Sequence, residues 1–176
     1  MIRFATLAAA TALLAFAAPA AASTAPVSVQ TAADPGLSVE AVRAWLISKG
    51  GSVSETKREG GETWVSISDG PLSWVIFFYS CQADVCGDIQ YAASFSNATI
   101  TPAMINDWNR DQRFLKAFFT PGEDGGTPVA VVQYDVLIHD GDVEQLTDHT
   151  ALWLDLVSDF GAAVGYFTTA DQADPR

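Results

Sequence analysis

The chain has 176 residues, 21 of them acidic and 9 basic, and its formal net charge is −12. This excess of negative charge is repelled by nucleic acids and by anionic membrane surfaces, so the composition argues against binding to either. The acidic residues are scattered along the chain, which favours a role in solubility over a basic partner or a bound cation. The length suits one domain with a sizeable core.

Residues 1–22 are typical of a secretory signal peptide. Arg3 provides a positive start, residues 5–18 form an almost unbroken apolar run, and three alanines precede Ser23. The apolar run is short for a transmembrane helix, and no second long run follows it. We therefore expect an exported protein with no integral membrane segment after cleavage near Ala22.

The remaining chain divides into a leader, a domain and a tail. Residues 23–36 are rich in Ala, Thr, Ser and Pro without periodicity and predict a flexible leader. The domain is predicted over 37–167, and the polar residues 168–176 predict a loose tail. The first helix is expected to start at Ser38 as N-cap and to end at the glycine pair 50–51.

The middle of the domain is predicted to be a run of strands. Residues 52–58 are polar and indicate a weak edge strand, whereas 62–68 alternate between apolar and polar positions. Residues 73–80 are apolar on both faces, as in a central strand, and 88–96 alternate again. The sequence thus predicts strands with apolar side chains on more than one face.

Cys81 and Cys86 lie at the two ends of the predicted loop between the last two of these strands. This position brings the two Cα atoms within disulfide reach, and an exported protein folds where disulfides form. A metal site would require two more ligands, and the chain has only His139 and His149 as histidines. Redox-active pairs usually have a two-residue spacing. A structural disulfide is the favoured interpretation, with metal and redox roles as alternatives.

The second half predicts a helix, a hairpin and a long helix. A helix is expected to start at Thr101-Pro102, and two strands are expected over 113–120 and 128–138 around a turn at 123–126. The last helix has apolar residues at alternating steps of three and four, namely Val143, Leu146, Thr150, Trp153, Val157, Phe160 and Val164. Asp142 is its expected N-cap, with Gln145 as capping-box partner.

The order of these elements indicates an α+β fold, an antiparallel sheet of about five to six strands with three helices. Several stretches are also similar to a known family. They are the aromatic strand 74–79, the Cys81–Cys86 turn leading into 89–95, Ile105-Asn106-Asp107-Trp108-Asn109 running on to Arg113-Phe114, the hairpin 123–135 and the helix 143–164.

Over roughly residues 37–165 the chain resembles the YbjN family, a bacterial group labelled as sensory transduction regulators. The resemblance implies the fold of that family, which it shares with type III secretion chaperones, and it implies a habit of binding proteins. It implies no catalytic residues. A bacterial family combined with a signal peptide leads us to expect a periplasmic or secreted protein.

The acidic turn at 139–144 is the best candidate for a cation site. His139, Asp140, Asp142 and Glu144 fall within six residues, and Glu123 or Asp124 could add a ligand. The spacing lacks the further oxygens of a calcium loop. A turn in which Asp142 caps a helix and Glu144 benefits from the helix dipole explains the same residues. We therefore expect no metal and no cofactor, and we interpret His149 as a surface or boundary residue.

The sequence argues against an enzyme. It has neither a Gly-x-Ser-x-Gly elbow, nor Ser-x-x-Lys, nor His-Glu-x-x-His, and a disulfide would remove both cysteines as nucleophiles. The surplus of aromatic residues on strands that are apolar on both faces is more informative. Three helices can cover one sheet face, so the other would be buried by packing, by a second copy or by a partner, unless the helices wrap enough of both faces.

These observations predict an exported, non-enzymatic protein-binding domain, chaperone-like or regulatory, whose partner is an unknown protein or a second copy of the chain. The alternative is a cation- or small-ligand-binding periplasmic module that uses the turn 139–144.

Overall fold

The structure is a computed structural model, and it describes residues 36–167. The predicted signal peptide (1–22), the leader up to residue 35 and the tail (168–176) lie outside the described residues. All described residues belong to one compact unit. Within this part of the chain, none of the helices has the length and apolar character needed to span a membrane.

Three helices and an antiparallel sheet make up the domain. The helices are α1 (Val39–Ser48), α2 (Pro102–Asp111) and α3 (Leu146–Ala163). The strands are β1 (Leu37–Ser38), β2 (Ser52–Val53), β3 (Lys57–Glu59), β4 (Glu62–Asp69), β5 (Leu72–Gln82), β6 (Val85–Ser96), β7 (Lys116–Thr120) and β8 (Val129–Leu137). The sheet order is β2-β4-β5-β6-β8-β7, while β1 pairs with β6 and β3 pairs with β4. The predicted α+β class is confirmed.

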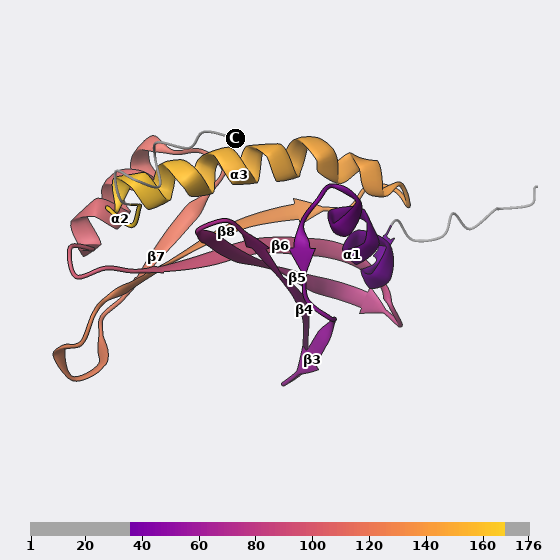
Figure 1. The fold of residues 1–176 in the computed structure, drawn as a ribbon, viewed down its shortest axis with the longest axis horizontal. Helices are drawn as coiled ribbons and strands as arrows, with labels where there is room; N and C mark the ends of the chain where they lie inside the picture. The colour runs from indigo at the N-terminus through magenta and orange to yellow at the C-terminus, as the bar shows by residue number, and fades with distance from the viewer. Residues whose placement is uncertain (1–35, 168–176) are drawn as a thin grey trace, which may run out of the picture. The chain divides into compact units, whose positions relative to one another are not determined.

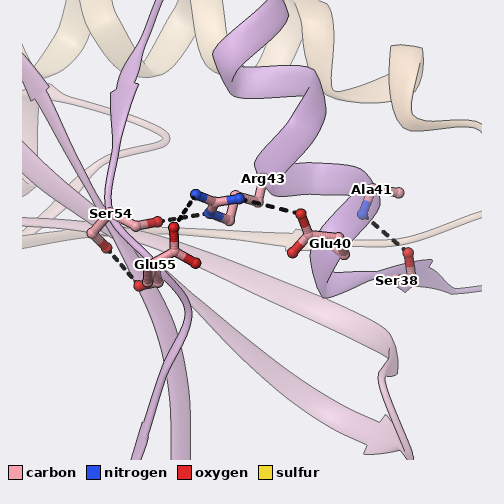
Figure 2. A network of polar contacts seen from close by, with 6 residues as sticks. All are labelled: Ser38, Glu40, Ala41, Arg43, Ser54 and Glu55. Atoms are coloured by element: carbon pink, nitrogen blue, oxygen red, sulfur yellow. Dashed lines mark hydrogen bonds and ion pairs between the residues drawn. The ribbon is translucent and has the colours of Figure 1, made fainter.

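Helix α1 begins where the sequence predicted, because the Ser38 hydroxyl accepts a hydrogen bond from the Ala41 N–H at 3.1 Å (Figure 2). The prediction missed β1, in which Leu37 and Ser38 pair with Cys86 and Val85 of β6. Two residues without alternation give no strand signal, so the tertiary contact with β6 decides this pairing.

The predicted edge strand 52–58 is interrupted, and Arg43 of α1 shows why (Figure 2). Its guanidinium donates to the Ser54 carbonyl at 2.8 Å and to Glu55 at 2.8 Å. With that carbonyl occupied, the Ser54 hydroxyl accepts the Ser66 N–H of β4 in its place. Val53 pairs with Ile67 but Lys57 pairs with Trp64, so three residues face two and form a bulge.

The β5–β6 hairpin is longer than predicted. The expected loop from Cys81 to Cys86 is instead a continuation of both strands, with a turn at Ala83-Asp84. Cys81 and Cys86 are directly paired across the hairpin, and a disulfide joins them with their Cα atoms 3.9 Å apart. Polar residues hid the ends of these strands, because exposed hairpin tips carry no apolar alternation.

The core lies between the sheet and the helices, as Figure 1 shows for α3 above the strands. The predicted stripe of α3 is buried, with Leu146, Trp153, Val157 and Phe160 each 0 % exposed. Trp153 contacts Trp74 of β5 and Tyr91 of β6 at ring distances of 6.0 and 5.7 Å. This three-ring cluster anchors the long helix to the two central strands.

Two local predictions in the second half were wrong in detail. Strand β7 begins at Lys116 and not near Arg113, because the Trp108 indole binds the Leu115 carbonyl and holds the preceding residues against α2. Asp142 caps a short 3-10 turn (Val143–Gln145) that precedes α3. A capping box does not form with Gln145, because the Asp142 N–H already donates to the Asp140 side chain.

Candidate functional site

One face of the sheet is left open by the described helices. Buried residues of α1, α2 and α3 belong to a single core cluster on one side of the sheet, and Figure 1 shows α2 and α3 on that side. On the other side, none of the helices among residues 36–167 covers the strands. We call this side the open face. Side chains there belong to residues that alternate with the buried ones along each strand.

Strand register arranges the open face in rows that run across the sheet. One row consists of Lys57, Trp64, Phe77, Gln90 and Asp135 on β3, β4, β5, β6 and β8. The next row towards the hairpin tip joins Tyr79, Asp88 and Leu137. Residues far apart in the sequence thus become neighbours on one surface.

Three aromatic residues form a cluster on the open face. The Trp64 and Phe77 rings have centroids 6.1 Å apart, and the Phe77 and Tyr79 rings are stacked with centroids 6.3 Å apart. Tyr79 is 39 % exposed. These distances fall in the usual range for aromatic pairs, so the cluster is packed within itself while one side faces outward.

Carboxylates surround this cluster. Glu62 extends from the start of β4 and Glu59 is its register partner on β3, while Asp88 and Asp135 come from β6 and β8. Burial, followed by the charges of Glu62 and Asp135, raises the pKa of the Tyr79 phenol above its usual value of 10.0. The Gln90 amide donates to Asp135 at 2.7 Å and orients that carboxylate.

Next to the cluster, on the side away from the β5–β6 hairpin tip, the open face is hollowed. A shallow hollow of about 350 Å³ lies over the middle of the sheet, lined by residues that include Val75, Phe77, Ala92 and Val131. Phe118 pairs with Val131 and is 53 % exposed, whereas Phe119 points to the other side and packs against the core. The open face therefore continues as an apolar surface from the cluster to β7.

The outer edge of β7 is closed by two residues of α2. The Asn109 side-chain amide donates to the Ala117 carbonyl and its oxygen accepts the Ala117 N–H, both at 2.8 Å. The Trp108 indole N–H donates to the Leu115 carbonyl at 3.2 Å. These bonds take the place of a further strand, so an extended peptide cannot pair with this part of the edge.

The acidic turn 139–144 uses its carboxylates within the protein. Asp140 accepts from the Asp142 N–H and from the Gln145 amide, and Asp142 accepts from the Glu144 N–H. Glu144 pairs with Lys49, the residue that follows α1, at 3.0 Å. Hydrogen bonds from that lysine and from Thr147 lower the Glu144 pKa. Among residues 36–167, no group of three or more His, Cys, Asp or Glu side chains is placed to hold a metal ion.

The other candidate residues are dispersed. Glu123 and Asp124 lie in the 3-10 turn η1 (Glu123–Gly125) before β8, and the turn 139–144 follows β8, so the two are at opposite ends of a nine-residue strand. They are not brought together as a shared cation site. His149 is half-buried, and its Nδ1 lies 2.6 Å from the Tyr134 hydroxyl. The open face was foreseen only as surplus apolar surface, and its carboxylates were missed because no local sequence pattern joins them.

Residues 38–165 match the sequence pattern of the family named YbjN, which is described as "Putative bacterial sensory transduction regulator". The chain belongs to the YbjN family. Among solved structures, it is similar to the crystal structure titled "YbjN, a putative transcription regulator from E. coli", with a TM-score of 0.51 and 18% sequence identity. The match covers 75% of this chain and 90% of that chain. At this identity the similarity shows a common fold. No curated protein matches the sequence.

Proposed function

We propose that this YbjN-family chain is exported to the bacterial periplasm or beyond, and that it acts there as a non-enzymatic, regulatory or chaperone-like protein-binding domain. The observation that carries the proposal is the open face. Phe118 is 53 % exposed and Leu137 is 66 % exposed on the same side of the sheet, which also carries Tyr79 and the hollow. Several large, exposed apolar side chains on one face of a domain are typical of a protein contact.

Two further features support the proposal. The family is described as a regulator, and regulators act by contact with other molecules. The blocked edge of β7 removes the competing mode in which a peptide adds a strand there. The acidic turn is left out of the proposed function, because its carboxylates already bond to neighbouring groups.

The test uses a photo-crosslinking amino acid placed at Phe118 or at Leu137 in the full-length chain expressed in a bacterial host. The matched control places it at Thr147, which is exposed on α3. We expect adducts from both positions on the open face and none from the control. Phe118→Asp should remove the adduct formed at 137 while the melting temperature stays unchanged.

The identity of the adduct then decides between partners. A heterologous protein supports the proposal, and an adduct of twice the monomer mass with a dimeric elution volume identifies a second copy. Equal adducts from both sides of the domain, or none from the open face, would overturn it. N-terminal sequencing of the protein recovered from the periplasmic fraction tests the export, and retention in the cytoplasm with residue 1 intact contradicts it.

A further inference from the structure

The end of the open face near the β5–β6 hairpin combines aromatic rings with negative charge. We define the acidic aromatic surface as Trp64, Phe77 and Tyr79 together with Glu59, Glu62, Asp88 and Asp135. Its three rings lie on two neighbouring strands, and its four carboxylates come from four strands around them. We propose that this surface binds an arginine or lysine side chain of the protein partner, flanked by apolar residues. This inference rests on the proposed function and adds the chemistry of the partner.

The rings supply the first part of the argument. A cation is attracted to the face of an aromatic ring when it lies within about 6 Å of the centroid, and indole is the strongest of the side-chain rings. Phe77 and Tyr79 are stacked at 26° and Trp64 is tilted at 41° to Phe77. The three rings are neighbours on the open face, and a planar guanidinium can stack on an aromatic ring.

The carboxylates supply the second part. Glu62 belongs to β4 and Asp135 to β8, so their strands lie on opposite sides of β5, which carries Tyr79. The bond from Gln90 occupies Oδ1 of Asp135 and leaves that carboxylate a second oxygen, Oδ2. A carboxylate beside a ring face strengthens the attraction for a cation, and two carboxylates provide several acceptors for guanidinium donors.

Among residues 36–167, none of the four carboxylates of this surface forms an ion pair with a basic side chain. Lys57 lies beside Trp64 in the register and is one ammonium against four carboxylates. Lys116 lies on the open face two residues from Phe118, but its ammonium is drawn to the carbonyls of Asn109 and Gln112 at the end of α2. The acidic aromatic surface is therefore the negative end of the open face.

Charge also decides against other occupants. A second copy would bring four more carboxylates and the same excess of negative charge, so self-association through this surface is opposed. Anionic lipid surfaces and nucleic acids are repelled for the same reason. A basic, apolar protein segment complements both the charge and the rings, and the neighbouring hollow offers space for its apolar side chains.

The test immobilises the full exported chain and selects, from a random library of short peptides, those that bind to it. We expect the selected peptides to contain arginine or lysine beside bulky apolar residues. Replacing arginine by citrulline, which keeps the shape and removes the charge, should weaken binding about tenfold. Fluorescence anisotropy of the labelled peptides measures this change, and a rise in salt concentration should also weaken binding.

Variants of the protein locate the binding. Glu62→Gln and Asp135→Asn should each weaken the peptide about two- to fivefold, since partly exposed charge pairs have that strength. Trp64→Leu keeps an apolar side chain and removes the indole ring, and it should weaken binding by a similar factor. The matched control is Glu123→Gln, which removes the same charge in the distant β7–β8 loop and should leave affinity unchanged. A melting curve of each variant checks that its fold is kept.

The outcomes separate the two proposals. The selected peptides could be neutral or acidic and lose binding in the Phe118→Asp variant. That result would overturn the proposal of a basic partner segment, but it would support protein binding on the open face. A failure to select peptides, or peptides that bind equally to all variants, overturns the basic partner. Neither of these outcomes touches the proposed function, which is overturned by the crosslinking results given above, namely no adduct from Phe118 and Leu137 or equal adducts from the control position.

Discussion

The amide of Asn109 closes the outer edge of β7, and its removal tests that packing directly. Both of its hydrogen bonds to Ala117 are 2.8 Å long, and Ala117 is only 2 % exposed. Each bond contributes about 1 kcal/mol, and a buried backbone group left unpaired costs about 1–3 kcal/mol. Asn109→Ala should therefore lower the free energy of unfolding by about 2–4 kcal/mol.

Urea denaturation followed by tryptophan fluorescence measures the change in unfolding free energy. In a domain of this size, each kcal/mol lowers Tm by roughly 2–4 °C, so a loss of roughly 4–16 °C is expected. The released edge should also promote association through β7, seen as larger species on gel filtration. The control is Asn106→Ala on the exposed side of α2, which should change stability by less than about 0.5 kcal/mol. Equal stability of the Asn109 variant and the wild type would refute the reasoning.

Three further predictions follow from buried, covalent and charged contacts. Trp153→Ala should lower unfolding free energy by about 3–5 kcal/mol in urea melts, because the ring is fully buried; a loss below about 1 kcal/mol contradicts the packing. Replacing Cys81 and Cys86 by serine should leave a folded domain that is less stable by about 2 kcal/mol, since the disulfide closes a short loop. A count of two free thiols in the unreduced exported protein argues against the bond. Lys49 lowers the pKa of Glu144, so the pair should stabilise the fold above the ordinary pKa of 4.5 and lose this effect as the pH falls further. Glu144→Gln should therefore melt below the wild type at neutral pH and approach it in acid, and a difference that persists in acid contradicts the ion pair.

Local chemistry made much of the fold predictable. The spacing of Leu146, Trp153 and Phe160 identified the long helix, because a buried helix face repeats every three to four residues. Ser38 and Thr101 marked two helix starts, since their hydroxyls accept the N–H groups that a helix leaves unpaired. These signals are short in range and need no knowledge of the partner elements.

Contacts between distant residues were not predictable from the same signals. Arg43 interrupts the first edge strand by taking a carbonyl eleven residues away, and Asn109 closes an edge strand that lies beyond the end of its own helix. The pairing of Leu37 with Cys86 depends on two segments of unrelated pattern. In each case a side chain or a short segment competes for a backbone group, and only the tertiary structure brings the competitors together.

The same division holds for the open face. The sequence by itself indicated that the central strands carry apolar side chains on both faces, because residues 73–80 do not alternate, and it left open what covers the second face. It could not determine that Glu62, Tyr79 and Asp135 share one face near the same hairpin, since each belongs to a different strand and their common face depends on the register. A shift of one residue in any of these strands would turn the side chain to the other face. The tertiary structure therefore decided the charge and the chemistry of the surface, because register converts separate alternating strands into one face.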